Sequence, residues 1–299
     1  MRQKFKLAVR YFFYPALAAI TLLYLGLELG RSQPSQSVGQ WYGIYLIGMV
    51  VVMISIEALM PLRDEWRMTR ARFWRRDLPF LMLGASTIAA ANYLATIVAM
   101  YYSLGRGGAL AGVPLLPGVL LALMTTDFCW YWVHRFSHTG SGKLGRWVWR
   151  VHAAHHMPAQ VYVLMHAIGH PVNAVVVRAI LTLPLFFLGL STEVVFVAGV
   201  VTGFQGLVSH MNIDSRVGWL NYILVGTELH RFHHSADPSE AKNFGAVVSI
   251  WDLLFGSFYY RPGAIPDRLG LQAPELYPSD MQLGKIIALP FHSDRPSVN

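Results

Sequence analysis

The chain has 299 residues, of which 54% are hydrophobic and only 13% are charged. Ordinary globular domains are about 45–50% apolar and about 25% charged, so this composition excludes a typical soluble domain and indicates a membrane protein. The net charge of +8 does not indicate nucleic-acid binding, because the basic residues lie mostly between apolar segments. The single cysteine, Cys129, excludes a disulfide framework and a cysteine-based zinc or iron–sulfur site.

Four apolar segments precede the histidine-rich part of the chain: residues 11–30, 41–60, 78–104 and 110–132. Each approaches or exceeds the roughly 20 residues that a membrane-spanning helix needs. The first follows four positive charges, as in a signal peptide, but it is long and no small-residue cleavage site follows it. We therefore expect an uncleaved first span. Glu57, near the end of the second segment, is expected to reach the membrane interface or to pair with an arginine.

Two further apolar runs, 171–190 and a second one ending near Val208, are separated by a short polar break. They predict a helical hairpin, and the sequence leaves open whether it crosses the membrane fully. Lys and Arg alternate between the loops, with six arginines in residues 63–76. By the positive-inside rule, this places the N-terminus and the histidine-rich stretch in the cytoplasm. We expect a bacterial inner membrane as the location.

The spacing of the histidines predicts a metal site. His134 and His138 are four residues apart, and the clusters HAAHH and HRFHH repeat i, i+3, i+4 spacings that share one helix face. Ten of the twelve histidines are candidate ligands, and only His166 and His292 fall outside the set: His134, His138, His152, His155, His156, His170, His210, His230, His233 and His234. Neutral imidazole binds Fe, Zn, Cu and Ni. Because one metal takes about four to six ligands, ten histidines indicate two metals.

Other residues in this region are candidate site residues. Asp127 lies two helical turns before His134, where a carboxylate can orient a ligand imidazole. Tyr131 belongs to an aromatic run, FCWYW, which fits a membrane-interface belt, although its hydroxyl can also turn toward the site. The paired Glu-x-x-His motif of carboxylate-rich di-iron bundles and the H-E-x-x-H motif of zinc proteases are absent from the sequence. The prediction is therefore a dinuclear site made almost entirely of histidines.

The boxes HRFSH, HAAHH and HRFHH, in this order after hydrophobic spans, resemble those of the fatty acid hydroxylase/sterol desaturase superfamily of membrane di-iron oxygenases. The resemblance covers roughly residues 127–271. It extends to His170 before a proline, to His210 with Asn212, and to the closing segments KNFG and WDLLFG. It implies that Asn212 belongs to the site. The sequence after HAAHH, MPAQVYVLMHA, departs from the polar run of many members and leaves the substrate class open.

The resemblance implies an all-α integral membrane protein with about four transmembrane helices, a helical hairpin and a cytoplasmic histidine-rich cap. The expected divisions are residues 1–108 for the first spans, 109–262 for the catalytic domain, and 263–299 for a loosely ordered tail. The implied activity is hydroxylation or desaturation of a C–H bond of a lipid, with two Fe ions, O2 and external electrons. The electron donor is expected to be a separate ferredoxin, cytochrome or reductase, because no fused redox module is apparent.

Three other functions are compatible with parts of the sequence. A zinc-dependent lipid hydrolase would use the same ligands, and a bis-histidine haem carrier would need histidines facing each other across the bilayer. A transporter with protonatable histidines is the third. The lipid substrate is either an acyl lipid, an amino lipid hydroxylated on its acyl chain or head group, or a sterol. A bacterial membrane lipid is favoured over a sterol.

Overall fold

The computed structural model describes residues 2–31, 38–103 and 108–292, which are helical and loop, with two isolated β-bridges. The long helices are α1 (Arg2–Arg31), α2 (Tyr42–Leu59), α4 (Leu78–Ser103), α5 (Leu115–Thr139), α6 (Gly142–His156), α7 (Pro171–Leu188) and α8 (Thr192–Ser209). The short ones are η1 (Asp64–Trp66), α3 (Arg70–Arg72), the π-helix η2 (Phe73–Asp77), η3 (Val163–Ala167), η4 (Gly218–Tyr222), α9 (Thr227–His233), α10 (Ile250–Leu254), η5 (Pro274–Leu276), α11 (Leu283–Ala288) and η6 (Leu289–Phe291). The predicted all-α class is confirmed.

Six segments of the described chain are long and apolar enough to cross a membrane. They contain α1, α2, α4, α5, α7 and α8, which correspond to the four expected spans and the two arms of the expected hairpin. Residues at the ends of α7 and at the start of α8 explain why the chain forms a hairpin here. Pro171 stands at the start of α7, where its missing N–H costs no hydrogen bond, and Gly189 ends α7 with a positive φ of 68°. Ser191 then caps α8 by accepting a hydrogen bond from the backbone N–H of Val194.

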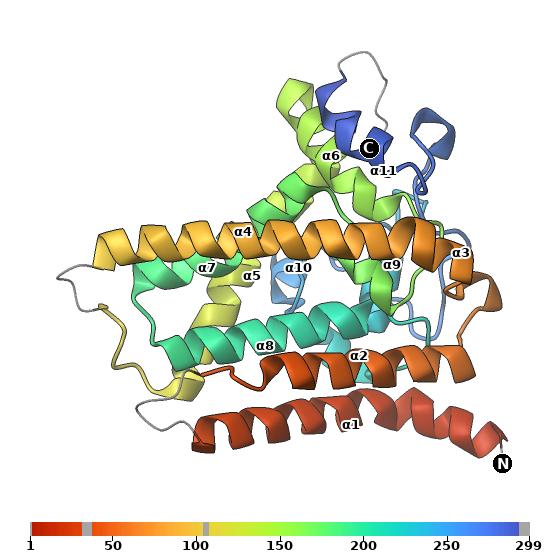
Figure 1. Ribbon diagram of the computed structural model, residues 1–299. Helices are drawn as coiled ribbons and strands as arrows, with labels where there is room; N and C mark the ends of the chain where they lie inside the picture. Colours follow the sequence, from red (N-terminus) through yellow and green to blue (C-terminus); the bar gives the residue numbers. More distant parts are fainter. Residues whose placement is uncertain (1, 32–37, 104–107, 293–299) are drawn as a thin grey trace.

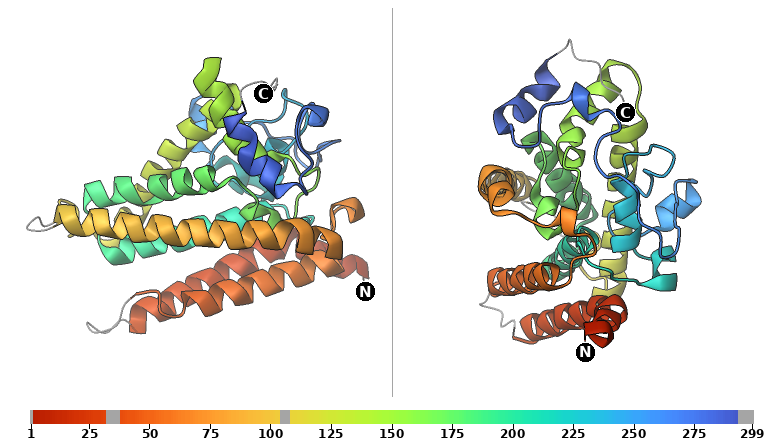
Figure 2. Two further views of the ribbon diagram at one scale, coloured as in Figure 1. Left: turned by 45° about the horizontal axis from the view of Figure 1, so that its top comes forward. Right: turned by 90° about the vertical axis from the view of Figure 1, so that its right-hand side faces the viewer.

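The apolar helices α1, α2, α4, α7 and α8 run along one common axis, and α5 crosses them obliquely (Figure 1). α1, α4 and α7 run in one direction along this axis, and α2 and α8 run in the other. α7 packs on α4, and α8 packs on α5 and α1. In the view down this axis, α6, α9 and the C-terminal helices gather beside the bundle (Figure 2). The N-terminus, the end of α2 and the arginine-rich segment of η1, α3 and η2 lie on one side, at the right of Figure 1.

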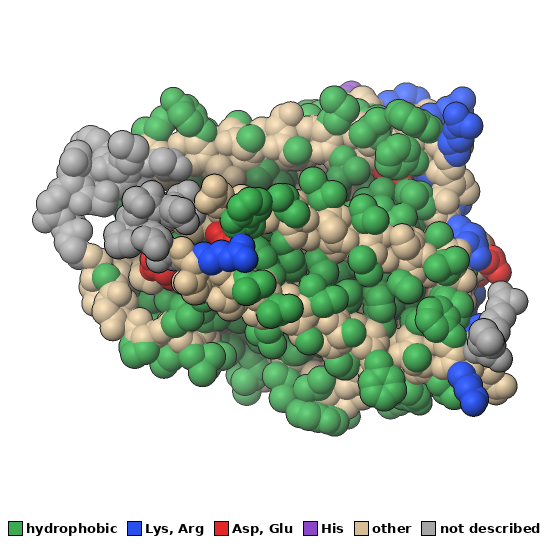
Figure 3. Space-filling view, turned by 60° about the horizontal axis from the view of Figure 1, so that its bottom comes forward, with side chains coloured by type: hydrophobic (Ala, Val, Ile, Leu, Met, Phe, Trp, Pro, Cys, Tyr) green, Lys and Arg blue, Asp and Glu red, His purple; other side chains and the backbone are tan. Residues whose placement is uncertain are grey.

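The distribution of apolar and charged side chains on the surface agrees with this arrangement of the helices. The face formed by α1 and α2 is covered by apolar side chains, whereas Lys and Arg gather at one end of it (Figure 3). Leu22 and Leu23 of α1 and Ile47 of α2 are between 63% and 67% exposed, which suits contact with lipid chains. The charge distribution thus separates an apolar belt from a basic rim.

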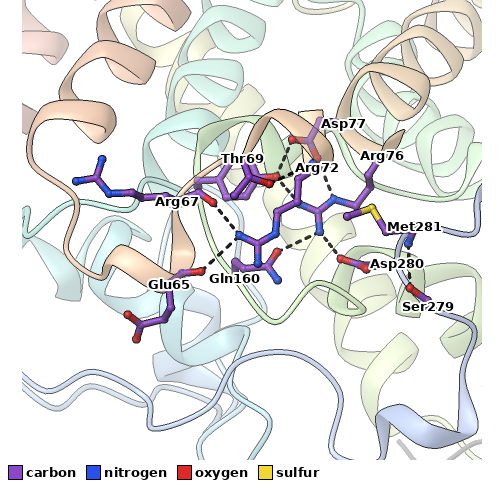
Figure 4. A network of polar contacts seen from close by, with 11 residues as sticks. Glu65, Arg67, Thr69, Arg72, Arg76, Asp77, Gln160, Ser279, Asp280 and Met281 are labelled. Carbon is purple, nitrogen blue, oxygen red and sulfur yellow. Dashed lines mark hydrogen bonds and ion pairs between the residues drawn. The ribbon is translucent and has the colours of Figure 1, made fainter. Parts of the chain in front are cut away.

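A buried network joins the arginine-rich segment to distant parts of the chain (Figure 4). Arg76 is fully buried and donates to Asp77, Gln160, Tyr162 and Asp280. The five residues come from the π-helix, from the loop after α6 and from the C-terminal segment. Since a buried guanidinium is tolerated only with such partners, Arg76 fixes these three segments to one another.

The C-terminal segment is ordered over residues 263–292, contrary to our expectation of a loose tail. Leu271, Tyr277 and Ile286 are buried in one apolar cluster with Trp149 of α6. The indole N–H of Trp149 also donates to the Tyr277 hydroxyl, at 2.7 Å. The sequence did not predict this packing, because the segment is rich in Pro and Gly and its few apolar residues are spaced irregularly. The last part of the expected tail, 293–299, lies outside the described residues.

Candidate metal centre

Nine of the ten predicted ligands form two compact groups, in each of which one ring nitrogen per histidine lies within 4.8 Å of those of the others. The five-histidine group consists of His134, His138, His152, His156 and His233. The four-histidine group consists of His155, His210, His230 and His234. The two groups are adjacent, since the rings of His156 and His234 are 4.5 Å apart, centre to centre. Each group could hold one metal ion, so the two groups together could hold two.

Helix periodicity explains how each box serves both groups. On α6, His152 and His156 are one turn apart and join the five-histidine group, while His155 points to the other group. On α9 and its C-cap the assignment is reversed: His230 and His234 join the four-histidine group, and His233 joins the five-histidine group. The two boxes face each other, so each i, i+4 pair meets the i+3 residue of the other box.

His155 and His210 show why the four-histidine group fits a cation. The Nδ1 of His155 donates to the carbonyl of Ile168 at 2.8 Å, and the Nδ1 of His210 donates to that of Gly206 at 2.7 Å. In a neutral imidazole the other nitrogen then carries a lone pair. The two Nε2 atoms nevertheless lie 3.1 Å apart. Two acceptors at this distance repel each other unless a cation, either a metal ion or a shared proton, lies between them.

The five-histidine group also brings the lone pairs of neutral imidazoles close together. The Nδ1 of His134 donates to the carbonyl of Phe244 at 2.7 Å, and the Nδ1 of His233 donates to that of Lys242 at 3.0 Å, so both Nε2 atoms carry lone pairs. These Nε2 atoms lie 3.0 and 3.2 Å from those of His152 and His156, respectively. The Nε2 of His138 is buried and has no hydrogen-bond partner among the described residues. The donor set therefore fits a metal ion here as well.

Burial keeps these imidazoles neutral. The pKa values of His156 and His233 are lowered well below 6.5, mainly by burial and then by neighbouring histidines, and burial also lowers the pKa of His155. The neutral form is the one that binds metals. The same lowering of the pKa, with burial as the main cause, applies to the other ligand candidates outside the apolar spans: His152, His210, His230 and His234.

The KNFG segment forms the outer wall of the five-histidine group, because its carbonyls hold His134 and His233. Its shape is set by Asp252, whose carboxylate accepts hydrogen bonds from the backbone N–H groups of Phe244 (2.7 Å) and Gly245 (2.9 Å). Asn243 adopts a φ of 61°, in the left-handed region that asparagine tolerates. The side chain of Asn243 also bonds the backbone of Leu229 and Tyr259.

Asp127 and Tyr131 lie behind this wall rather than against the ligand imidazoles. The Asp127 carboxylate accepts hydrogen bonds from the N–H groups of Ala246 (2.9 Å) and Val247 (2.8 Å), so it holds the loop that follows KNFG. The Tyr131 hydroxyl is buried 2.8 Å from the Ser257 hydroxyl and does not point into either histidine group. Asp127 thus supports the site through this loop, and Tyr131 supports it through Ser257, whose hydroxyl donates to Asp252.

Asn212 is also a support residue in this structure. Its side chain accepts a hydrogen bond from the N–H of Arg63 and donates one to the carbonyl of the same residue. Its backbone N–H donates to Glu57 at 2.7 Å, and the same carboxylate oxygen accepts from the N–H of Val163 at 2.9 Å. Glu57 is buried, so our expectation of an interfacial carboxylate was wrong. A lone carboxylate late in an apolar segment was the only sequence signal for this role.

Three further histidines lie outside both groups. His170 caps α7: its Nδ1 accepts from the N–H of Val172, and its Nε2 donates to the carbonyl of Ile287. Both of its nitrogens are thus engaged, and the geometry gives no support to its predicted role as a ligand. The ring of His166 lies 5.0 Å from that of His210, beside the four-histidine group. The imidazole of His292 donates to the carbonyl of Ala288, and the backbone carbonyl of His292 accepts from Arg150.

A bundle of apolar helices with two adjacent groups of histidines defines a helical membrane protein in which each histidine group could hold a metal ion. Residues 119–257 match the fatty acid hydroxylase family, which confirms the resemblance that the histidine boxes predicted.

Two kinds of characterised enzymes are similar to this chain. It is 28% identical over 240 residues to the ornithine lipid hydroxylase OlsE of Rhizobium tropici, a match that covers 77% of this chain and 71% of OlsE. It is 30% identical over 139 residues, 46% of its length, to the alkylglycerol monooxygenases of Danio rerio and Homo sapiens, covering 30% and 29% of their lengths. No solved structure matches the chain. The relatives are hydroxylases and monooxygenases, which supports an oxidoreductase.

Proposed function

We propose that the protein is a membrane-bound di-iron oxygenase that hydroxylates a C–H bond of a membrane lipid. The overall reaction converts R–H, O2, two electrons and two protons into R–OH and water. The observation that supports a metal centre most directly is the 3.1 Å approach of the His155 and His210 Nε2 atoms, since the Nδ1 hydrogen bonds of both rings leave only lone pairs there. The hydroxylase relatives support the reaction type.

In this proposal each histidine group holds one iron. The bound irons supply the activation of O2 and the cleavage of the C–H bond. The protein supplies geometry: the carbonyls of Ile168, Gly206, Lys242 and Phe244 fix the ring orientation of four ligands. Burial of the ligand rings excludes bulk water from the reacting groups.

A cavity of about 340 Å³ with a mixed polar and apolar lining adjoins the five-histidine group. It reaches His138 and His156 and contains Arg135 and Lys242 in its wall. We assign to it the entry of the protons that the reaction consumes. Electrons come from a separate ferredoxin, cytochrome or reductase on the side of the N-terminus and the basic rim, which we assign to the cytoplasm by the positive-inside rule.

For the substrate we propose an acyl lipid or amino lipid of a bacterial inner membrane. The support is the similarity to OlsE, which extends over most of both chains, whereas the similarity to the alkylglycerol monooxygenases covers less than a third of those enzymes. Desaturation, in which a second hydrogen is removed instead of hydroxyl being added, is the alternative outcome of the same chemistry.

The test compares lipids from a bacterial host expressing the wild type, His155→Ala or His292→Ala. We expect mass spectrometry to show a lipid with one added oxygen in the wild type and in His292→Ala, which is the matched histidine control, but not in His155→Ala. A lipid that has lost two hydrogens would indicate desaturation. Two zinc ions per chain with activity independent of O2 would indicate a hydrolase, and a Soret band in the purified protein would indicate a haem carrier. Either result would overturn the proposal.

A further inference from the structure

A second cavity adjoins the five-histidine group from another direction. It is a groove of about 360 Å³ between α5, α6 and α7. α6 and α7 both pack on α5 but contact each other much less, so the groove runs over the surface of α5 between them. Its wall is almost entirely apolar and includes Trp130 and Val133 of α5, Val148 and Val151 of α6, and Val176 of α7.

The inner end of this groove is formed by the metal centre. His134 and His152 line it, whereas no member of the four-histidine group does. The indole of Trp130 stacks on the His134 ring at 4.7 Å, with an interplanar angle of 29°. Asn173, the polar residue that α7 contributes, lies with its Oδ1 3.4 Å from the Nδ1 of His152. An occupant of the groove would therefore meet the centre at His134 and His152.

The outer end of the groove is apolar and open. Trp132 and Phe136 lie in its wall and are 41% and 40% exposed. They belong to α5, and α5 and α7 are both apolar enough to span a membrane. In contrast, the other cavity on the five-histidine group has a mixed lining and contains two cations, Arg135 and Lys242. The group thus has one charged and one apolar approach, and only the apolar approach matches a hydrocarbon chain.

We propose that this groove binds the acyl chain of a bilayer lipid, which enters sideways between α6 and α7, and that the five-histidine group is the half of the centre that faces the substrate. The proposal deepens the proposed function and rests on it for the reaction, but binding in the groove is measurable without turnover. Val176 and Val175 provide a matched pair of test positions. Val176 lines the groove, whereas Val175, the next residue of α7, does not line it and is 45% exposed.

The experiment uses the full-length protein in nanodiscs of phosphatidylethanolamine and phosphatidylglycerol, doped with a phosphatidylethanolamine that carries a diazirine in its acyl chain. After illumination, peptide mass spectrometry locates the adducts. We expect adducts on the groove-lining stretches of α6 and α7, around Val148 and Val176. Val176→Trp should reduce the α6 adducts at least five-fold, and Val175→Trp should leave them unchanged. Equal labelling of α6 in both variants would overturn the proposal.

Three controls keep the result decisive. Val148→Phe is the second variant if Val176→Trp does not fold, and it should reduce the α7 adducts to the same degree. A free fatty acid with the same diazirine should label the groove less than the phospholipid, and the reverse order would overturn a bilayer lipid as the source. Labelling on only the outer faces of the helices would indicate annular lipid and would also overturn it.

Labelling and turnover separate the two proposals. If the groove is labelled but no oxidised lipid is formed, the groove remains a binding site for an acyl chain, and the proposed oxygenase activity is rejected. In the active enzyme, Trp130→Ala should move the site of hydroxylation along the acyl chain while the iron content stays at the wild-type value. An unchanged position would reject the five-histidine group as the half that faces the substrate.

Discussion

Glu57 accepts a hydrogen bond at 2.7 Å from the backbone N–H of Asn212, 155 residues later in the chain. The same oxygen accepts from the N–H of Val163 at 2.9 Å. One carboxylate at the end of α2 therefore holds both loops that flank the four-histidine group: the turn after His210 and the segment between α6 and α7. This contact connects the apolar bundle to the centre.

Replacing Glu57 by Leu should weaken this connection. Two buried N–H groups would lose their acceptor, at about 1–3 kcal/mol each. We expect a lower free energy of unfolding and a loss of iron from the four-histidine group, measured by thermal unfolding in detergent and by metal analysis. Glu57→Gln keeps an acceptor oxygen and is the matched control. An iron content unaffected by Glu57→Leu would show that the loops hold their positions without this contact.

Adjacent histidines should control different irons. His233 belongs to the five-histidine group and His234 to the four-histidine group. We expect His233→Ala and His234→Ala each to reduce iron from two ions to about one per chain, and the double variant to bind almost none. Metal analysis and iron spectroscopy measure this, with His166→Ala as a control that retains both. If either single variant loses both irons, the two groups do not bind metal independently.

Asp252 should act on the metal without touching it. Asp252→Ala removes the acceptor of the Phe244 and Gly245 N–H groups, so the carbonyl that orients His134 loses its position. Loss of such outer contacts typically weakens metal binding about 10–100-fold. Competition with a chelator measures the change. Asp237→Ala, at an exposed carboxylate, should behave as the wild type. Equal metal affinity in both variants would contradict this role.

The metal-free protein should lose stability in acid. Burial lowers the pKa of His156 and the neighbouring ligands, so below pH about 6.5 the unfolded chain binds more protons than the folded chain. The free energy of unfolding therefore falls as the pH decreases below about 6.5, by up to about 1.4 kcal/mol per pH unit for each such histidine. Chelator-treated protein unfolded by denaturant at pH 7.5 and 5.5 measures this. His292→Ala should keep the same slope, and a flat profile would contradict the prediction.

The C-terminal segment should contribute to stability through Asp280. Asp280→Ala removes one carboxylate from the buried Arg76 and should cost about 1–3 kcal/mol, because a buried donor loses its partner. Glu275→Ala, an exposed change in the same segment, should cost almost nothing. Thermal unfolding compares the two. Equal stability would show that Asp77, Gln160 and Tyr162 satisfy Arg76 without Asp280.

Local patterns made much of the fold and the ligand set predictable. The apolar runs that became α1, α2, α4, α5, α7 and α8 are continuous in the sequence, since a span is recognised from length and hydropathy alone. The i, i+3 and i+4 spacings of HAAHH and HRFHH likewise fix which side chains share a helix face. Nine of the ten predicted ligands now lie in the two groups.

Only the tertiary structure decided how the ligands are divided and what supports them. His233 joins His134 and His156 rather than its neighbour His234 because side chains from α5, α6 and α9 meet in the folded chain. Contacts between such distant parts of the chain leave no regular spacing in the sequence. The carbonyls that hold His134 and His155 are backbone atoms, which every residue has, so no side-chain type marks them. His170 shows the reverse case: its position before Pro171 resembled a ligand motif, but in the folded chain its two nitrogens cap α7 and bind the C-terminal segment.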